Sequence, residues 1–354
     1  MPDGELLPIL ALTMGDPVGI GPEVVAKALA APEVQAACRP LVVGNAAVLR
    51  RAAAQCGIRL DVREAGSVDD LVTGPGVASV LDPLAGAGAP DLAALPLGRV
   101  SAEAGRASVA YVLAAIDLAM ARRVAGMVTA PINKEAMNRA GFHYAGHTEL
   151  LAERTGRPEA AMMLVTGHLR VAHVTTHVAL ERVPELITPE RLATVFDLTW
   201  EAVRQLGIER PRIAVAGLNP HAGEHGLFGS QEEAVIAPAV NAAQAQGRDF
   251  SGPWPPDTIF ARAQRREFDA VVAMYHDQGH IAIKMVGFDE GVNVSLGLPI
   301  VRTSVDHGTA FDIAGKGIAR PVSMIQATLL AAQLARARGL AGGSVPGGGP
   351  PGVQ

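Results

Sequence analysis

Short apolar runs alternate with amphipathic stretches along most of this 354-residue chain. Apolar runs rich in β-branched residues are typical of buried strands, whereas apolar residues at helical spacing indicate helices packed on one face. We expect strands at 9–14, 41–43, 126–129, 171–174, 213–216 and 270–274, and helices from Pro22 and at 46–56, 102–121, 133–139, 189–206 and 232–246. Strands that alternate with helices predict an α/β fold with a mainly parallel sheet covered on both faces.

The length of the chain and two irregular stretches bear on its domain organisation. A chain this long is expected to form one large domain or two closely packed ones. Residues 81–97 are rich in Ala, Gly and Pro, which predicts a surface loop, and 342–354 are nearly all small residues, which predicts a disordered tail. We therefore expect a single catalytic unit over residues 1–340, made of two interleaved subdomains that part near 129–133.

Composition excludes several classes of partner. Hydrophobic residues make up 49% of the chain and charged residues 18%, as in a well-buried globular protein. A net charge of -5 argues against nucleic acid as a partner. No apolar stretch is long enough to predict a membrane span, and the first residues lack a signal-peptide pattern. Cys38 and Cys56 form no CxxC pair, so we expect a cytoplasmic protein with free thiols.

Three histidines each follow one of the predicted strands. His177 comes after 171–174, His221 after 213–216, and His276 directly after 270–274. Because the carboxyl ends of parallel strands line the ligand cleft of open α/β sheets, the three imidazoles are expected to converge there. Three imidazoles would form a metal site with a position left for substrate, and Asp277 could orient the ring of His276. The alternative is that each one is an ordinary buried or turn histidine.

Two further motifs leave two interpretations open. The glycine-rich turn at 15–23 could bind a phosphate or nucleotide through the N–H groups of a helix start, or could simply be a tight strand-to-helix connection. It matches neither the Walker loop nor G-x-G-x-x-G. In 145–149, His147 and Thr148 could bind an anionic substrate at a helix amino terminus, or one of them could cap that helix.

Lys284 and the segment 291–308 supply two cations and the amide of Asn293. Arg302 follows the apolar run 298–301, where an unpaired charge would be costly, so we expect it to have a fixed anionic partner. Lys284 and Arg302 are predicted to clamp a phosphate and a carboxylate. The alternative is ordinary surface charge.

Taken together, these segments resemble the 4-hydroxythreonine-4-phosphate dehydrogenase family. The resemblance runs from about Ile9 to Gly317, through TMGDPVGIGPE, AGHTE, TTHVAL, GLNPHAGE, MYHDQGH and GVNVSLGLPIVRTSVDHGTA. It implies an isocitrate/isopropylmalate-dehydrogenase-like fold, with two α/β/α subdomains around a cleft, and a homodimer with a shared active site. It also implies a cofactor, NAD or NADP, and a divalent metal such as Zn, Co or Mg.

By this resemblance the residues of the site acquire roles. His177, His221 and His276 are the metal ligands, and the one that matches His276 crosses from the partner subunit. The substrate-binding residues are His147, Thr148, Lys284, Asn293 and Arg302. Lys284 is also the candidate catalytic residue, acting by charge or proton transfer.

The implied reaction is oxidation of the carbon-3 hydroxyl of 4-hydroxy-L-threonine 4-phosphate, then decarboxylation to 3-amino-2-oxopropyl phosphate, in pyridoxal phosphate biosynthesis. An alternative is the family branch that oxidises 4-phospho-D-threonate or 4-phospho-D-erythronate to dihydroxyacetone phosphate. His280, the run 226–229 and TAFDIAGKGIA resemble that branch. A third branch, which oxidises a dihydrodiol of terephthalate, departs from the His147–Thr148 pair that is intact here.

Two other classes of protein remain open on the residues alone. A metal-dependent hydrolase would use the open metal position to activate water, with Asp257 or Asp277 as base. A non-catalytic metal-binding or scaffold protein would not need Lys284, Asn293 and Arg302 beside the histidines.

Overall fold

The computed structural model describes residues 6–86, 88, 90–144, 146–287 and 289–340, so the predicted tail at 342–354 lies outside the described residues. Within these ranges twelve strands form one sheet in the order β3-β4-β2-β1-β5-β12-β11-β6-β7-β10-β8-β9. The strands are β1 (Ile9–Thr13), β2 (Arg39–Val43), β3 (Asp61–Glu64), β4 (Val77–Leu81), β5 (Gly126–Thr129), β6 (Ala161–Thr166), β7 (Leu169–His173), β8 (Ile213–Ala216), β9 (Phe250–Trp254), β10 (Ala270–Ala273), β11 (Val292–Leu296) and β12 (Arg302–Val305).

Helices connect most of these strands. They are α1 (Gly21–Leu29), α2 (Pro32–Ala37), α3 (Ala46–Gln55), α4 (Ala102–Met120), α5 (Lys134–Arg139), α6 (His147–Thr155), α7 (Val183–Leu186), α8 (Pro189–Gln205), α9 (Ala237–Ala245), α10 (Pro256–Gln264), α11 (His276–Gly287) and α12 (Val322–Ala337). The 3-10 helices are η1 (Val68–Asp70), η2 (Leu180–Arg182) and η3 (Pro220–Gly223), and η4 (Glu232–Ile236) is a π-helix. None of the described helices is both long and apolar enough to cross a membrane.

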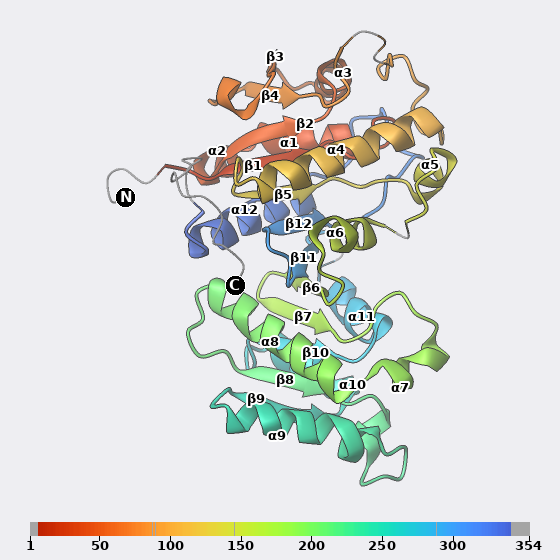
Figure 1. The fold of residues 1–354 in the computed structure, drawn as a ribbon, viewed down its shortest axis with the longest axis vertical. Coiled ribbons are helices and arrows are strands. Elements are labelled where there is room, and N and C mark those ends of the chain that lie inside the picture. Colours follow the sequence, from red (N-terminus) through yellow and green to blue (C-terminus); the bar gives the residue numbers. More distant parts are fainter. Residues whose placement is uncertain (1–5, 87, 89, 145, 288, 341–354) are drawn as a thin grey trace, which may run out of the picture.

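The sheet runs along the whole length of the molecule, from β3 and β4 at one end to β9 at the other (Figure 1). Helix α4 packs against β1 and β5, and α12 packs against β11 and β12. The α/β prediction is confirmed, and most strand pairs are parallel. The exceptions are the antiparallel pairs β6–β7, β6–β11 and β11–β12 in the middle of the sheet. The segment 291–308, considered above only for its charges, supplies β11 and β12, and β12 pairs with β5 from far earlier in the chain.

Side chains cap the starts of four helices. The side chains of Asn45, Ser101, Asn133 and Thr188 each accept a hydrogen bond from a backbone N–H in the first turn of α3, α4, α5 and α8. Such caps satisfy N–H groups that have no partner within the helix. The predicted helix at 232–246 differs from expectation, because it begins as the π-helix η4 before α9. The division into two subdomains near 129–133 stays a prediction; β5 ends there and the chain leaves the sheet.

The glycine-rich turn between β1 and α1 is a packed connection. Gly15 has a φ of 71°, and a Cβ there would lie 2.4 Å from the carbonyl oxygen of Pro131. A Cβ on Gly21 would lie 2.3 Å from the carbonyl oxygen of Met14. Only glycine tolerates these approaches. The interpretation as a tight strand-to-helix connection is therefore the one that this geometry supports.

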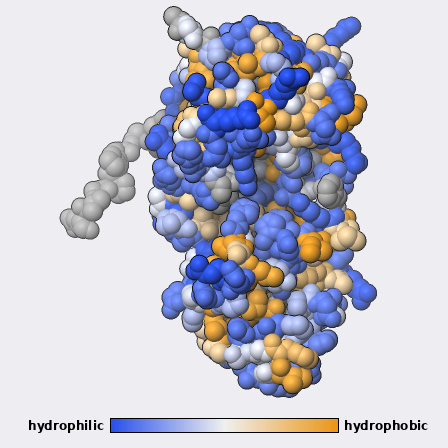
Figure 2. Space-filling view, turned by 90° about the vertical axis from the view of Figure 1, so that its right-hand side faces the viewer, coloured by the Kyte–Doolittle hydropathy of each residue, from blue (hydrophilic) through white to orange (hydrophobic). Residues whose placement is uncertain are grey.

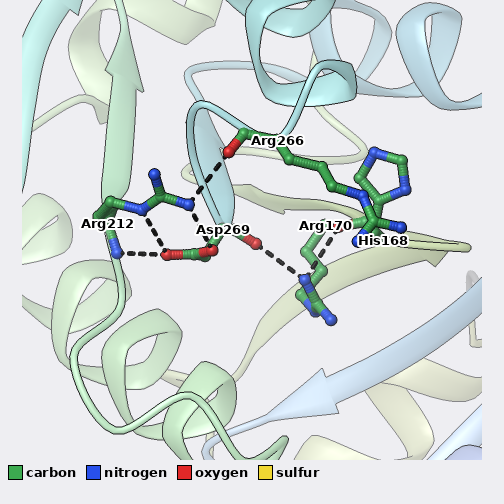
Figure 3. Close-up of polar contacts among 5 residues, drawn as sticks. All are labelled: His168, Arg170, Arg212, Arg266 and Asp269. Atoms are coloured by element: carbon green, nitrogen blue, oxygen red, sulfur yellow. Dashed lines mark hydrogen bonds and ion pairs between the residues drawn. The ribbon is translucent and has the colours of Figure 1, made fainter.

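A polar network ties together the amino-terminal ends of β7, β8 and β10 (Figure 3). The carboxylate of Asp269, just before β10, accepts hydrogen bonds from the backbone N–H and the guanidinium of Arg212, just before β8. The guanidinium of Arg170, in β7, donates to the carbonyl oxygens of His168 and Asp269. Burial alone would raise the pKa of Asp269, but the contacts with Arg212 outweigh it and hold that pKa below its usual value. The network thus fixes these three strands at their amino-terminal ends, whereas the histidines follow their carboxyl-terminal ends.

Candidate functional site

The three predicted histidines follow three neighbouring strands. β10 pairs in parallel with β7 on one side and with β8 on the other. His177 follows β7, His276 opens α11 directly after β10, and His221 lies in η3 after β8. The arrowheads of β7 and β8 point to the right in Figure 1, and Figure 2 looks onto that side of the molecule, where hydrophilic residues gather near the middle. The three histidines thus follow neighbouring parallel strands, whereas their convergence on one metal ion stays a prediction.

A cavity of about 490 Å³ lies beyond the carboxyl ends of these strands, and most of the predicted site residues line it. Of the eight, the six that line it are His147, His177, His276, Lys284, Asn293 and Arg302. His221 is not among its lining residues, and the side chain of Thr148 lies outside the described part of the structure. The cavity draws on β11, β12, α5, α6 and α11, so segments far apart in the sequence form it together.

Arg302 brings a buried positive charge to this cavity. Its side chain is 2% exposed and donates to the hydroxyls of Ser295 (3.0 Å) and Thr129 (2.8 Å). Its Nε has no hydrogen-bond partner among the described residues. Burial lowers the pKa of Arg302 to about 9, which measures how poorly the protein compensates the charge. An anion bound in the cavity would supply the partner that the sequence predicted for this residue.

His147 lies beside this charge, in the first turn of α6. Gly146 occupies the N-cap position and no side chain caps the helix, so the suggestion that His147 or Thr148 is the cap is wrong. Burial, and secondarily the nearby Arg302, hold the pKa of His147 well below its usual value, so its ring is neutral. The Nε2 atom is buried and has no partner among the described residues. His147 therefore brings an imidazole to the lining of the cavity at a helix amino terminus, where a negative charge is stabilised.

The imidazoles of His177 and His276 are close neighbours, with ring centroids 5.5 Å apart. Burial, followed by the nearby His276 and Lys134, lowers the pKa of His177, which favours the neutral form that binds metals. His276 contacts the Asp277 carboxylate through Nδ1 at 2.7 Å, the orienting contact that the sequence suggested. His280 stacks on His276 at 3.6 Å between centroids, and burial lowers its pKa to about 4.

His221 stands apart from this pair within one chain. Its ring is exposed and lies 5.9 Å from that of Phe228. Among the residues described in a single chain, no three or more His, Cys, Asp or Glu side chains are grouped so that they could hold a metal ion. His177 and His276 thus fit two positions of the predicted metal site, and the third ligand stays a prediction.

Several polar residues line the cavity that sequence reasoning did not select. They are Lys134, Glu149, Ser304, Asp306 and His307, besides His280. Burial raises the pKa of Asp306, although Lys284 and His307 oppose this shift. Its position directly after β12 was the signal that could have found it. That signal depends on recognising 302–305 as a strand.

Comparison with known proteins decides the family. The family described as "Pyridoxal phosphate biosynthetic protein PdxA" matches residues 36–331. The chain belongs to the PdxA family. This confirms the resemblance stated from the sequence, and with it the prediction of an oxidoreductase, because the relatives that follow are all named dehydrogenases.

Relatives within the PdxA family carry two different substrate names. A 4-hydroxythreonine-4-phosphate dehydrogenase of Desulfosudis oleivorans is 50% identical, covering 88% of this chain and 91% of the relative. A D-threonate 4-phosphate dehydrogenase of Cupriavidus necator is 47% identical, covering 94% and 99%. The crystal structure of 4-hydroxythreonine-4-phosphate dehydrogenase from Klebsiella pneumoniae superposes with a TM-score of 0.82 at 44% identity, covering 93% of this chain and 99% of that one.

Proposed function

We propose that this PdxA-family chain oxidises the carbon-3 hydroxyl of 4-hydroxy-L-threonine 4-phosphate with NAD or NADP, and that decarboxylation to 3-amino-2-oxopropyl phosphate follows. The observation that carries the proposal is the buried guanidinium of Arg302, which lines the cavity and whose hydrogen-bond partners among the described residues are two hydroxyls. A buried cation in this state favours an anionic ligand.

The charges that line the cavity match such a substrate. Lys134, Lys284 and Arg302 are cations, and a phosphate and a carboxylate require cationic or N–H donors. His147, neutral at the start of α6, is placed to donate a hydrogen bond to the phosphate. The predicted side-chain contact from Thr148 would add a second donor at the same helix start.

The metal proposal rests on the pair His177 and His276, with His221 as the third ligand. When bound there, a divalent ion such as Zn, Co or Mg would act as a Lewis acid on the substrate hydroxyl. Asp277 holds the ring of His276 through Nδ1, which leaves Nε2 available. Lys284 lines the same cavity and is proposed to assist by its charge or by accepting the proton that the carbon-3 hydroxyl loses as hydride passes to the nicotinamide.

The resemblance assigned the crossing ligand to His276, but His276 lies beside His177 in the same chain. In a homodimer with a shared active site, we propose that His221 is the imidazole that joins this pair from the other subunit. The surface next to the histidines is apolar enough to support this proposal. On α11, Met285 is 82% exposed, and Ile281 and Val286 are exposed beside it. The segments that follow β7 and β8 add Val178, Leu180, Leu227 and Phe228, all exposed. Apolar residues on this face also appear in Figure 2. Such patches are typical of protein–protein interfaces.

Both cysteines are free thiols, which supports the proposal of a cytoplasmic enzyme. The net charge of -5 is the ground for proposing that nucleic acid is not a partner.

The second candidate substrate is 4-phospho-D-threonate, favoured by the name of the Cupriavidus necator relative. The two substrates differ at carbon 2, where one has an ammonium group and the other a hydroxyl. Asp306 lines the cavity as a partly buried carboxylate with a raised pKa, and an ammonium would compensate its charge. This favours the amino substrate.

One assay tests the proposal. Purified protein with Zn, Co or Mg receives NAD or NADP and either acid phosphate, while nicotinamide absorbance is followed. Reduction with 4-hydroxy-L-threonine 4-phosphate supports the proposal; reduction with 4-phospho-D-threonate alone moves the enzyme to the other branch. Release of inorganic phosphate without reduction would identify a hydrolase. Lys284→Met should bind metal and cofactor but turn over far more slowly, and undiminished turnover would exclude its proton-transfer role.

A further inference from the structure

The loop after β8 that carries His221 has an unusual backbone. Six consecutive residues have φ in the left-handed region: His221 at 54°, Ala222 at 52°, Gly223 at 83°, Glu224 at 43°, His225 at 54° and Gly226 at 88°. Non-glycine residues rarely adopt this conformation, because the Cβ atom approaches the following carbonyl oxygen. A run of this kind persists only where contacts from the surrounding structure hold it.

One buried carboxylate contacts the chain just before this run. Glu232 is 2% exposed, although it lies more than ten residues further along the chain. Its Oε1 accepts the backbone N–H groups of Leu218 (2.8 Å) and Asn219 (2.7 Å), and its Oε2 accepts the side-chain amide of Asn219 (2.9 Å). The same amide donates to Gln231 at 2.8 Å. The chain is therefore fixed two residues before His221.

Three glycines leave room for this arrangement. A Cβ on Gly223 would lie 2.8 Å from Oε2 of Glu232, and one on Gly229 would lie 2.4 Å from the side-chain nitrogen of Asn219. A Cβ on Gly217 would approach Ala222 at 2.8 Å and Oε1 of Glu232 at 3.2 Å. The loop is thus packed closely around the carboxylate–amide pair.

Glu232 is also the first residue of the π-helix η4. A π-helical turn contains an extra residue compared with an α-helix, and such turns occur frequently at functional sites. The extra residue lies where the carboxylate meets the loop. The strained loop and the irregular helix are therefore joined by one contact, which lies two residues before His221.

We propose that Glu232 is a positioning residue: it fixes the left-handed loop and so holds His221 in the orientation that a metal ligand needs. The role of His221 as a ligand comes from the proposed function, whereas the hold of Glu232 on the loop does not depend on it. Two independent readouts separate these parts, the hydrogen exchange of the loop and the affinity of the apoprotein for a metal ion.

The first variant is Glu232→Gln, compared with Glu233→Gln as a control, because Glu233 is the exposed neighbour. The glutamine carbonyl can still accept the two backbone N–H groups, but its amide then faces the amide of Asn219, donor against donor. We expect faster backbone exchange over 217–229 and Zn²⁺ or Co²⁺ binding weaker by about 10- to 100-fold, measured by calorimetry. Glu233→Gln should match the wild type in both.

A swap of polarity supplies the rescue. Asn219→Asp alone places two carboxylates together and should loosen the loop as well, which also covers the case in which Glu232→Gln folds poorly. In the double variant Asn219→Asp with Glu232→Gln, the new amide donates to the new carboxylate. Exchange and metal affinity should then return toward wild-type values, beyond the sum of the single effects.

The outcomes are distinct. Unchanged loop exchange in Glu232→Gln, or a double variant no better than the sum of its parts, overturns the positioning role. A wild type that binds metal no better than His221→Ala removes the ligand assignment of the proposed function, and loop exchange then decides the role of Glu232 alone. Loss of stability with unchanged metal affinity and unchanged exchange over 217–229 would leave Glu232 a purely structural residue and overturn the proposal.

Discussion

Replacing Arg302 with methionine should make the ligand-free protein more stable while abolishing productive substrate binding. The reason is that Arg302 is 2% exposed and its hydrogen bonds go to two neutral hydroxyls, those of Ser295 and Thr129. Burying a cation costs desolvation free energy, and two neutral hydroxyls compensate only part of that cost. Methionine has a similar length and no charge, so it fills the space without that cost.

The size of the effect follows from the pKa. Burial lowers the pKa of Arg302 from 12.5 to about 9, and at ~1.4 kcal/mol per pKa unit this corresponds to about 5 kcal/mol. The variant loses two hydrogen bonds, worth about 1 kcal/mol each. The ligand-free variant should therefore be more stable by about 3 kcal/mol. Conversely, a substrate anion that loses this partner should bind about 100-fold or more weakly, because breaking a buried ion pair costs several kcal/mol.

Chemical denaturation of both proteins without ligand measures the first effect, and kcat/KM the second. Arg170→Met is the matched control, since Arg170 is also partly buried but lies in the network of Figure 3 and donates to two carbonyl oxygens. It should lower stability and leave kcat/KM unchanged. If Arg302→Met were instead less stable than wild type without ligand, the protein itself would already compensate this charge, and the reasoning would fail.

Three further predictions concern stability and specificity. The pKa of buried Asp16 is raised to about 6 by desolvation, so its contribution to stability is present below pH 3.8 and is lost as pH rises through 6. Asp16→Asn should gain about 2 kcal/mol relative to wild type between pH 4 and 7 in denaturation curves, and an equal difference at both pH values would contradict this. In Gly279→Ala the new Cβ would lie 2.3 Å from Nε2 of His173, which should cost about 1–3 kcal/mol of stability and displace α11 with its site residues. The thermal unfolding temperature and the activity should both fall. In the control Gly66→Ala, where the nearest atom is 3.4 Å away, both should stay unchanged. Asp306→Asn should raise KM for 4-hydroxy-L-threonine 4-phosphate about 10- to 100-fold, because the ammonium at carbon 2 loses its carboxylate partner, and should barely change KM for 4-phospho-D-threonate. Equal effects on both substrates would show that Asp306 does not contact the carbon-2 substituent.

The sequence predicted the parts of the site that local patterns encode. Each of the three histidines follows a short apolar run, and adjacency of β7, β10 and β8 then places them at one edge. Arg302 was identified because a charge directly after an apolar run needs a partner. In both cases the prediction depends only on residues that are neighbours in the sequence, an apolar run and the polar residue that follows it.

What the sequence missed depends on long-range pairing. The segment 291–308 contains glycines and a proline between its apolar residues, so its two strands give no clear period. Nevertheless β12 pairs with β5 and brings Arg302 to Thr129. Asp306 could be found only after β12 was known. The left-handed conformation of 221–226 is equally hidden, because four of its six residues are not glycine and a sequence pattern would not suggest positive φ there.

Asp269 and Asp306, at opposite ends of the strands, have opposite pKa shifts, and this difference bears on function. At the amino-terminal edge Asp269 meets Arg212 directly, and its pKa is lowered, so the charges there compensate each other. At the carboxyl edge the shifts of Arg302 and Asp306 both run against the charged form, since burial lowers the pKa of the first and raises that of the second. A buried charge that the protein compensates poorly contributes most to binding free energy when a ligand group of opposite charge binds beside it. A substrate with two anionic groups and one ammonium would compensate both residues at once, so its binding should stabilise the fold more than binding of inorganic phosphate, which can compensate Arg302 alone.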